Sequence, residues 1–280
     1  MSGQLELNLA FTFGLIGMGL GWKWGLNQVS GFYDSASAVK YLMFGLVLGT
    51  LYALFSDNLV LRDYIRFING EQELVIMNFI ISILLSISIS LLIMLLLTRK
   101  NLLSTKSGTT SGWSLGLGIG AMFSSRFSYL SLEYYGIGIL SLLQVVLFVV
   151  MLPIFEGAIC SYQGSLSSKG FRFKSSFIAS VGRFFFLMIL PAIFMEIIWW
   201  VILIPVIMLL YRKSITDWIP QSMTQEAKRR YRRIMASNAR RVKDLENPGK
   251  NTNIVQNITY NIQDSSIVGD LKPEINSNKD

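Results

Sequence analysis

Residues 175–211 read SSFIASVGRFFFLMILPAIFMEIIWWVILIPVIMLLY, and this stretch decides the fold. Most of it is apolar, so it belongs in the hydrocarbon of a membrane. As a single helix it would be about 55 Å long, whereas the hydrocarbon is about 30 Å thick. We therefore predict that it crosses the membrane twice, with the apex of a hairpin at Pro191, because proline breaks a helix.

The whole chain has the composition of a polytopic membrane protein. Of its 280 residues, 52% are hydrophobic and 15% are charged, and the apolar residues form runs too long for one soluble core. Runs of about 18 or more apolar residues predict membrane spans. We predict an all-α membrane bundle of about seven transmembrane helices, at residues 7–27, 38–57, 74–97, 112–131, 136–158, 175–191 and 193–211. The first span has no basic region before it, so we expect it to be retained rather than removed as a signal peptide.

Basic residues in the connections predict the orientation, because they gather on the cytoplasmic side. Seven crossings place three basic groups on one side: Arg99, Lys100 and Lys106; Lys169, Arg172 and Lys174; Arg212 and Lys213. We therefore expect a multi-pass protein of the cell membrane, with its N-terminus outside and its C-terminal tail in the cytoplasm. Arg62 and Arg66 lie on the outer side against this rule, and we expect them in a short interfacial helix.

The composition divides the chain into three parts. Residues 1–218 form the transmembrane bundle, residues 219–247 a basic cytoplasmic helix, and residues 248–280 a polar tail that we expect to be disordered. Much of the net charge of +8 follows the last span, which favours anionic lipid headgroups over nucleic acid as the partner. A membrane or cytosolic protein that binds the tail is a further possible partner. The residues expected at the headgroups are Lys228, Arg229, Arg230, Arg232 and Arg233.

The residue types restrict the chemistry. The chain has no histidine, which excludes a histidine triad and removes the commonest metal ligand. Cys160 is the one cysteine, so it has no partner for an internal disulfide. We predict neither a metal nor a cofactor.

Charged residues inside spans cost about 2.5–3.5 kcal/mol each, so they usually face a partner or a water-filled cavity. From the depths of the predicted spans we expect two ion pairs between helices. Arg126 and Glu196 would pair in the outer half of the membrane, and Arg183 and Glu156 in the cytoplasmic half. Alternatively, Glu196 lines a substrate path or cavity, or it has no partner and lies at the membrane interface. Lys40 lies close enough to a span end to extend its ammonium to the headgroups.

Two spans are rich in glycine, which allows helices to approach closely. Neither follows a strand as a nucleotide-binding loop would, so we predict helix packing at both. The glycines are Gly14, Gly17, Gly19 and Gly21 in the first span, and Gly116, Gly118 and Gly120 in the fourth.

Residues 118–129, GIGAMFSSRFSY, resemble the GxGFAxxENxxY span of PrsW-type intramembrane proteases. Residues 153–164 and 191–199 are similar to the two segments of that family that carry its histidines, and residues 36–42 have the frame of its EExxK motif. Together these segments extend over about residues 36–205. The resemblance implies a PrsW-like helical scaffold.

The catalytic residues of that family are replaced in this chain. Ala36 and Ser37 stand in place of the two glutamates of EExxK, Ser125 and Arg126 in place of the glutamate and asparagine of the glycine span, and Glu156 and Glu196 about where the two histidines would be. A water-activating mechanism needs groups that accept its proton. The resemblance therefore implies the scaffold without the catalytic machinery, a pseudoprotease.

Three functions remain open. The first is a non-catalytic protein that binds a membrane partner or a hydrophobic segment between its helices, with Ser125, Arg126, Glu156, Arg183 and Glu196 as its intramembrane polar site. The second is a small-solute transporter or channel subunit that uses an Arg126/Glu196 pair. The third is an active protease in which a Glu156/Glu196 dyad replaces the family's acid and base groups. We expect no enzyme activity from the first two.

Overall fold

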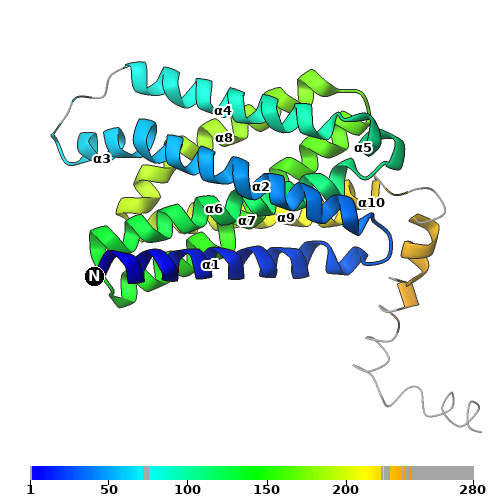
Figure 1. The fold of residues 1–280 in the computed structure, drawn as a ribbon, viewed down its shortest axis with the longest axis horizontal. Helices are drawn as coiled ribbons and strands as arrows, with labels where there is room; N and C mark the ends of the chain where they lie inside the picture. Colours follow the sequence, from blue (N-terminus) through cyan, green and yellow to red (C-terminus); the bar gives the residue numbers. More distant parts are fainter. Residues whose placement is uncertain are drawn as a thin grey trace, which may run out of the picture. The chain divides into compact units, whose positions relative to one another are not determined.

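The computed structural model describes residues 2–71, 73, 76–221, 223, 228–234, 236, 237 and 240. It divides the chain into two compact units, Met1–Lys228 and Arg229–Asp280. The predicted polar tail, residues 248–280, lies outside the described residues. In the described residues helices occur throughout and no strand is present (Figure 1).

The first unit contains long helices joined by short connections. In chain order its elements are α1 (Ser2–Gly25), the 3-10 turn η1 (Asn27–Val29), α2 (Ser35–Ser56), the π-helical turn η2 (Asp57–Leu61), α3 (Arg62–Ile68), α4 (Ile76–Leu97), α5 (Lys100–Thr105), α6 (Gly108–Tyr135), α7 (Ile139–Ser168), α8 (Arg172–Met195), the 3-10 turn η3 (Ile197–Trp199), α9 (Trp200–Lys213), the π-helical turn η4 (Ser214–Trp218) and α10 (Ile219–Gln221).

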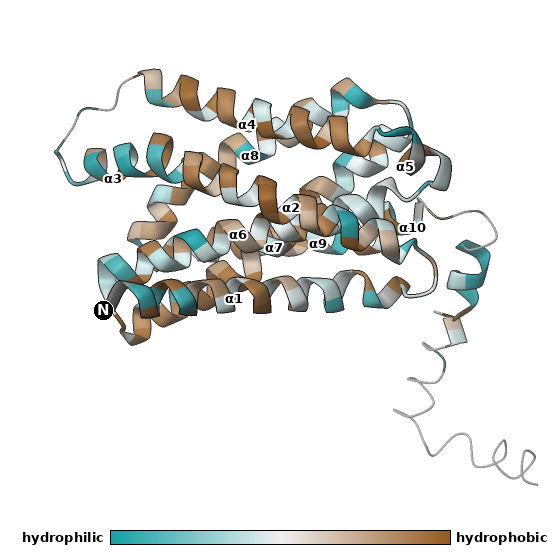
Figure 2. Ribbon diagram, in the orientation of Figure 1, coloured by the Kyte–Doolittle hydropathy of each residue, from teal (hydrophilic) through white to brown (hydrophobic). Residues whose placement is uncertain are grey.

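Several of these helices have the length and composition of membrane spans. Within the described residues, six helical segments qualify: Gln4–Gly25, Ser35–Phe67, Ile76–Leu97, Ile139–Ser168, Arg172–Met195 and Ile197–Trp218. Figure 2 shows the apolar character of α4 along most of its length, in contrast to α3, where hydrophilic and hydrophobic residues are mixed. The predicted all-α membrane bundle is confirmed.

Helix α6 lies at the centre of the bundle. It has 28 residues, enough to cross a membrane, but its glycines and serines make it less apolar than the six segments above. Most of its residues are buried, because α1, α2 and α7 pack around it. With α6 included, the long helices agree with the seven predicted spans.

The glycines of α6 explain how its neighbours approach so closely. A Cβ atom at Gly116 or Gly120 would meet the backbone of α7, and one at Gly118 would lie 2.5 Å from the carbonyl oxygen of Leu42 in α2. The glycines therefore lie on two sides of α6 and bring two backbones against it. The predicted packing role of these three glycines is confirmed.

The glycines of α1 follow the same principle with one exception. Side chains at Gly14 and Gly21 would collide with α6, and one at Gly17 would collide with the backbone of α7. Gly19 faces open space, because among the described residues no neighbouring atom lies within 4 Å of the position that a Cβ atom would take. The packing prediction is therefore wrong for Gly19, because this residue lies on the outward side of α1.

The hairpin predicted at Pro191 turns at a later residue. Helix α8 continues through Pro191 to Met195, and the chain then becomes extended at Glu196, with φ −136° and ψ 122°. Helix α9 returns in the opposite direction (Figure 1). The predicted apex is wrong because Pro191 is buried inside α8, where the loss of one backbone donor does not end the helix.

Successive long helices run in alternating directions (Figure 1). The α1–α2 turn, α5, the α7–α8 turn and the end of α9 therefore lie at one end of the bundle, which we call the basic end because these connections hold the basic groups named above. The start of α1, α3 and the α8–α9 turn lie at the other end. A short helix is present where one was expected around Arg62 and Arg66, and it continues from α2 through η2.

The second unit is described only in part. Its residues 229–234 are helical, and Arg229, Arg230, Arg232 and Arg233 are exposed. These residues belong to the predicted basic helix at residues 219–247, whose full extent stays a prediction, as does its binding to lipid headgroups.

Candidate functional site

Arg183 is the centre of a buried polar cluster between α4, α7 and α8. Its Nε and Nη2 atoms donate to the carboxylate of Glu156 at 3.1 and 2.8 Å. Nη1 donates to Ser90 at 2.8 Å and to Gln163 at 3.1 Å, and Nη2 lies 3.0 Å from the Sγ atom of Cys160. The guanidinium is fully buried, and polar groups of α4 and α7 replace its hydration. The predicted Arg183/Glu156 pair is confirmed.

This cluster leaves Glu156 little capacity for acid–base chemistry. Both of its carboxylate oxygens contact the guanidinium of Arg183, and the side chain is nearly inaccessible to solvent. A buried charge is tolerated only when its partner stays in place. The arrangement is therefore that of a structural counter-ion.

Arg126 has a different partner from the predicted one. Its Nε atom donates to Oδ2 of Asp57 at 3.0 Å, and its Nη2 atom forms an ion pair with the same oxygen. Arg62 approaches the other oxygen of Asp57 at 3.5 Å. Asp57 is 1% exposed, in the π-helical turn that follows α2, and Arg126 is 24% exposed. The predicted Arg126/Glu196 pair is wrong.

Sequence reasoning missed Asp57, although it is the last residue of the predicted span 38–57. The sequence contained a signal for this pair. Asp57 lies at the outer end of the predicted span 38–57, which is about the depth of Arg126 in the predicted span 112–131.

Glu196 lies apart from these ion pairs. It is exposed at the break between α8 and η3, about 20 Å along the chain direction from Arg183 at 1.5 Å per residue. Since Glu156 is bound to Arg183, the structure does not bring the two glutamates into a dyad. The Glu156/Glu196 dyad of the third alternative is therefore not formed, because Glu196 lies in the connection after α8.

Ser125 lines a cavity of about 180 Å³ together with Arg126, and none of the other three predicted polar residues lines it. Its hydroxyl is buried and donates to the carbonyl of Ala121 in the same helix at 2.8 Å, next to Gly14 of α1. The five predicted polar residues thus separate into a core ion pair, an Arg126/Asp57 pair, an exposed Glu196 and a packed Ser125. One shared polar site is not formed.

A line of polar residues on α4 was not predicted. Asn78, Ser82, Ser86 and Ser90 recur every fourth residue and are all buried, so they form one stripe that faces the interior of the bundle. Only the last of them reaches Arg183. The spacing was visible in the sequence, but the uniform apolarity of the surrounding residues concealed which side of α4 is inside.

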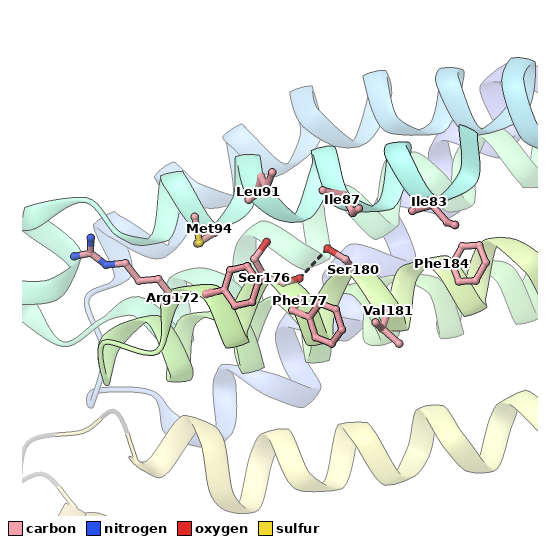
Figure 3. A pocket seen from close by; sticks show the side chains of 11 residues that line it. Ile83, Ile87, Leu91, Met94, Arg172, Ser176, Phe177, Ser180, Val181 and Phe184 are labelled. Atoms are coloured by element: carbon pink, nitrogen blue, oxygen red, sulfur yellow. Dashed lines mark hydrogen bonds between the residues drawn. The ribbon is translucent and has the colours of Figure 1, made fainter. Parts of the chain in front are cut away.

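Two apolar cavities lie beside α8. The first, which we call the α4–α8 groove, has a volume of about 690 Å³ and runs between these two helices. Figure 3 shows Ile83, Ile87 and Leu91 of α4 along one side and Phe177 and Phe184 of α8 along the other.

The second cavity, which we call the α8–α9 crevice, has a volume of about 890 Å³ and is lined by α7, α8, α9 and η4. Exposed apolar side chains such as Phe185 and Ile202 line it, and Lys213 and Asp217 lie at one end. This crevice lies between the two arms of the hairpin that decides the fold.

Comparisons with protein-family models, with curated proteins and with solved structures found no match to this chain.

Proposed function

We propose that this protein is a non-catalytic membrane protein with a PrsW-like scaffold, which binds a transmembrane segment of a partner protein in the α8–α9 crevice. We further infer that the basic end of the bundle faces the cytoplasm, because basic residues gather on that side of cell membranes.

The length of the crevice is the observation that carries this proposal. At 1.5 Å per residue, its lining extends about 21 Å along α8, from Ile178 to Ala192, and about 28 Å from Trp199 to Trp218. The hydrocarbon of a membrane is about 30 Å thick. A crevice of this length matches a whole transmembrane helix better than the acyl chain of one leaflet.

The composition of the crevice supports the same occupant. Phe185 is 66% exposed and Ile202 57% exposed, so the opposed walls offer apolar surface. Gly182 of α8 also lines the crevice and has no side chain there. Small residues allow a second helix to approach closely. Lys213 and Asp217 at the end of α9 offer both signs of charge to polar residues that flank the bound span.

The buried ion pairs support a non-catalytic role. Glu156 is engaged by Arg183, and Arg126 by Asp57, so two of the three charged residues at the positions of the family's catalytic groups hold helices together. A general base needs an accessible lone pair within reach of the proton that it takes.

Site-specific photocrosslinking tests the proposal. We expect a photoreactive phenylalanine analogue at Phe185 and at Ile202 to form adducts with one and the same membrane polypeptide. Leu84, which is 57% exposed on α4 and lines neither cavity, is the matched control and should not form that adduct.

A variant that fills the crevice provides the second part of the photocrosslinking experiment. Gly182→Leu should remove the adduct at both positions, whereas Leu84→Phe, which adds bulk elsewhere, should leave it intact. Adducts that contain only lipid, or that persist in Gly182→Leu, would contradict the proposal. A partner that accumulates uncleaved only after Glu156→Ala would instead indicate an active protease.

The α4 stripe favours solute passage as a second candidate function. Within this stripe, Asn78 Nδ2 and Ser86 Oγ are buried and have no hydrogen-bond partner among the described residues. Unpartnered buried polar atoms are costly unless water or a solute reaches them. A cavity of about 410 Å³ opens beside Asp57 at the end opposite the basic end.

Transport in liposomes separates the two functions. If solute passage occurs, the reconstituted protein should carry a current or an uptake that Arg126→Ala abolishes, because this arginine neutralises Asp57 near the opening. Lys40→Gln is the control variant. It also removes one positive charge but leaves the polar interior unchanged, because Lys40 is exposed near the start of α2, so it should retain the flux.

A further inference from the structure

The α4–α8 groove differs from the crevice in its length. Its lining extends from Ile83 to Met94 on α4, about 17 Å, and from Arg172 to Phe184 on α8, about 18 Å, at 1.5 Å per residue. One leaflet contributes about half of the 30 Å of hydrocarbon, or about 15 Å. The groove therefore matches an acyl chain that extends through a single leaflet.

The walls of the groove are almost entirely apolar along this length. Ile87 and Leu91 form one side, and Phe177 and Val181 the other, and all four are more than one third exposed. In a membrane these side chains face hydrocarbon. In the membrane, lipid acyl chains are therefore the molecules that surround this groove and can occupy it.

One end of the groove carries a positive charge. Arg172, the first residue of α8, lines the groove at this end, and Figure 3 shows its guanidinium extending beyond Met94, away from the apolar walls. This end is the basic end of the bundle, where Lys169 and Lys174 flank the same turn. A lipid phosphate at the level of Arg172 would contact its guanidinium.

We propose that the α4–α8 groove is a binding site for an anionic phospholipid of the leaflet at the basic end, with one acyl chain between α4 and α8 and the phosphate at Arg172. The length of the groove favours an acyl chain of one leaflet, and the positive charge of Arg172 at its end favours an anionic headgroup. The proposal rests on the groove alone and is independent of what the α8–α9 crevice binds.

Native mass spectrometry of the purified full-length chain tests the site. The probes are phosphatidylglycerol and phosphatidylcholine with identical acyl chains, so that only the headgroup differs. We expect tighter binding of phosphatidylglycerol. Arg172→Gln should weaken that binding about five-fold, the effect of one basic residue near an anionic surface, and leave phosphatidylcholine unchanged.

Two matched pairs of variants make the test decisive. Lys174→Gln removes the same charge two residues away without lining the groove, and it should change phosphatidylglycerol binding less than two-fold. Leu91→Trp fills the groove and should weaken the binding of both lipids, whereas Leu92→Trp, at a similarly exposed neighbour outside the groove, should not. All four side chains are exposed, so each variant is expected to fold, which thermal unfolding checks.

Three outcomes would overturn the proposal. Equal losses in Arg172→Gln and Lys174→Gln would reduce the effect to diffuse surface charge. Equal behaviour of Leu91→Trp and Leu92→Trp would show that the groove holds no chain. A retained polypeptide in place of lipid, lost in Leu91→Trp, would assign the groove to a protein partner.

Discussion

Gly116 of α6 lies directly against the backbone carbonyl of Glu156 in α7, with no room for a side chain between them. The close packing of the glycine-rich helix α6 therefore occurs at the residue that carries the buried carboxylate, Glu156. The residue of α7 whose carbonyl meets Gly116 is the same residue whose carboxylate pairs with Arg183 of α8.

Substitution of Gly116 should destabilise the bundle. Gly116→Ala forces apart two backbones in contact, and overpacking of this kind costs about 1–3 kcal/mol. Thermal unfolding in detergent measures the loss. Gly19→Ala is the control, because it meets no neighbour and should be neutral or slightly stabilising. Equal destabilisation by both variants would show that glycine packing is not the cause.

Removal of one member of the Arg183/Glu156 pair should be severe. Glu156→Ala or Arg183→Ala leaves an uncompensated charge in the bundle interior, at a cost of about 3–5 kcal/mol in the free energy of unfolding. The double variant Glu156→Leu/Arg183→Met should recover most of this loss, since an apolar pair of similar volume needs no counter-ion. A double variant as unstable as the sum of the single ones would argue against direct pairing.

The Arg126/Asp57 pair makes a separate prediction. Arg126→Met should lower stability by about 1–3 kcal/mol, because it leaves the buried carboxylate of Asp57 without its main partner. Glu196→Gln should change stability by less than about 0.5 kcal/mol, as expected for an exposed residue. Chemical denaturation of the two variants distinguishes this pairing from one between Arg126 and Glu196, which would make both substitutions costly.

Asp34 should contribute a pH-dependent stability to the start of α2. Its carboxylate accepts hydrogen bonds from the Ser37 hydroxyl and the Ala36 amide, and the bond from Ser37 holds the pKa of Asp34 below its usual range. A lowered folded-state pKa gives stability that is present above the unfolded-state pKa of about 3.9 and is lost as the pH falls through the folded-state pKa.

Asp34→Ala should therefore cost about 1 kcal/mol near pH 6, the usual value of an N-cap, and less near pH 3. Thermal unfolding at the two pH values measures this difference. Asp34→Asn keeps an acceptor for the amide of Ala36 and should remove the pH dependence while retaining much of the stability. An Asp34→Ala effect that is the same at both pH values would contradict this assignment.

The predicted ion pair of Arg183 is correct and that of Arg126 is wrong, because matching depth selects a partner only when one candidate lies at that depth. Arg183 and Glu156 lie on helices that follow each other closely in the chain, so matching depths were enough to identify the pair. Arg126 had two acidic residues near its depth, Asp57 and Glu196. Depth alone could not select between them, because the choice depends on which sides of α2, α6 and α8 face one another.

The sequence by itself determined that this chain is an all-helical membrane bundle with about seven long helices and one basic end. Apolar length and charge placement are local properties, and the thickness of the hydrocarbon converts them directly into spans. Only the tertiary structure decided that Asp57 partners Arg126, that Gly19 faces outward and that two grooves of different length flank α8. In a helix that is apolar on all sides, lipid-facing and protein-facing surfaces have the same composition, so the rotation of each helix is settled by packing with its neighbours.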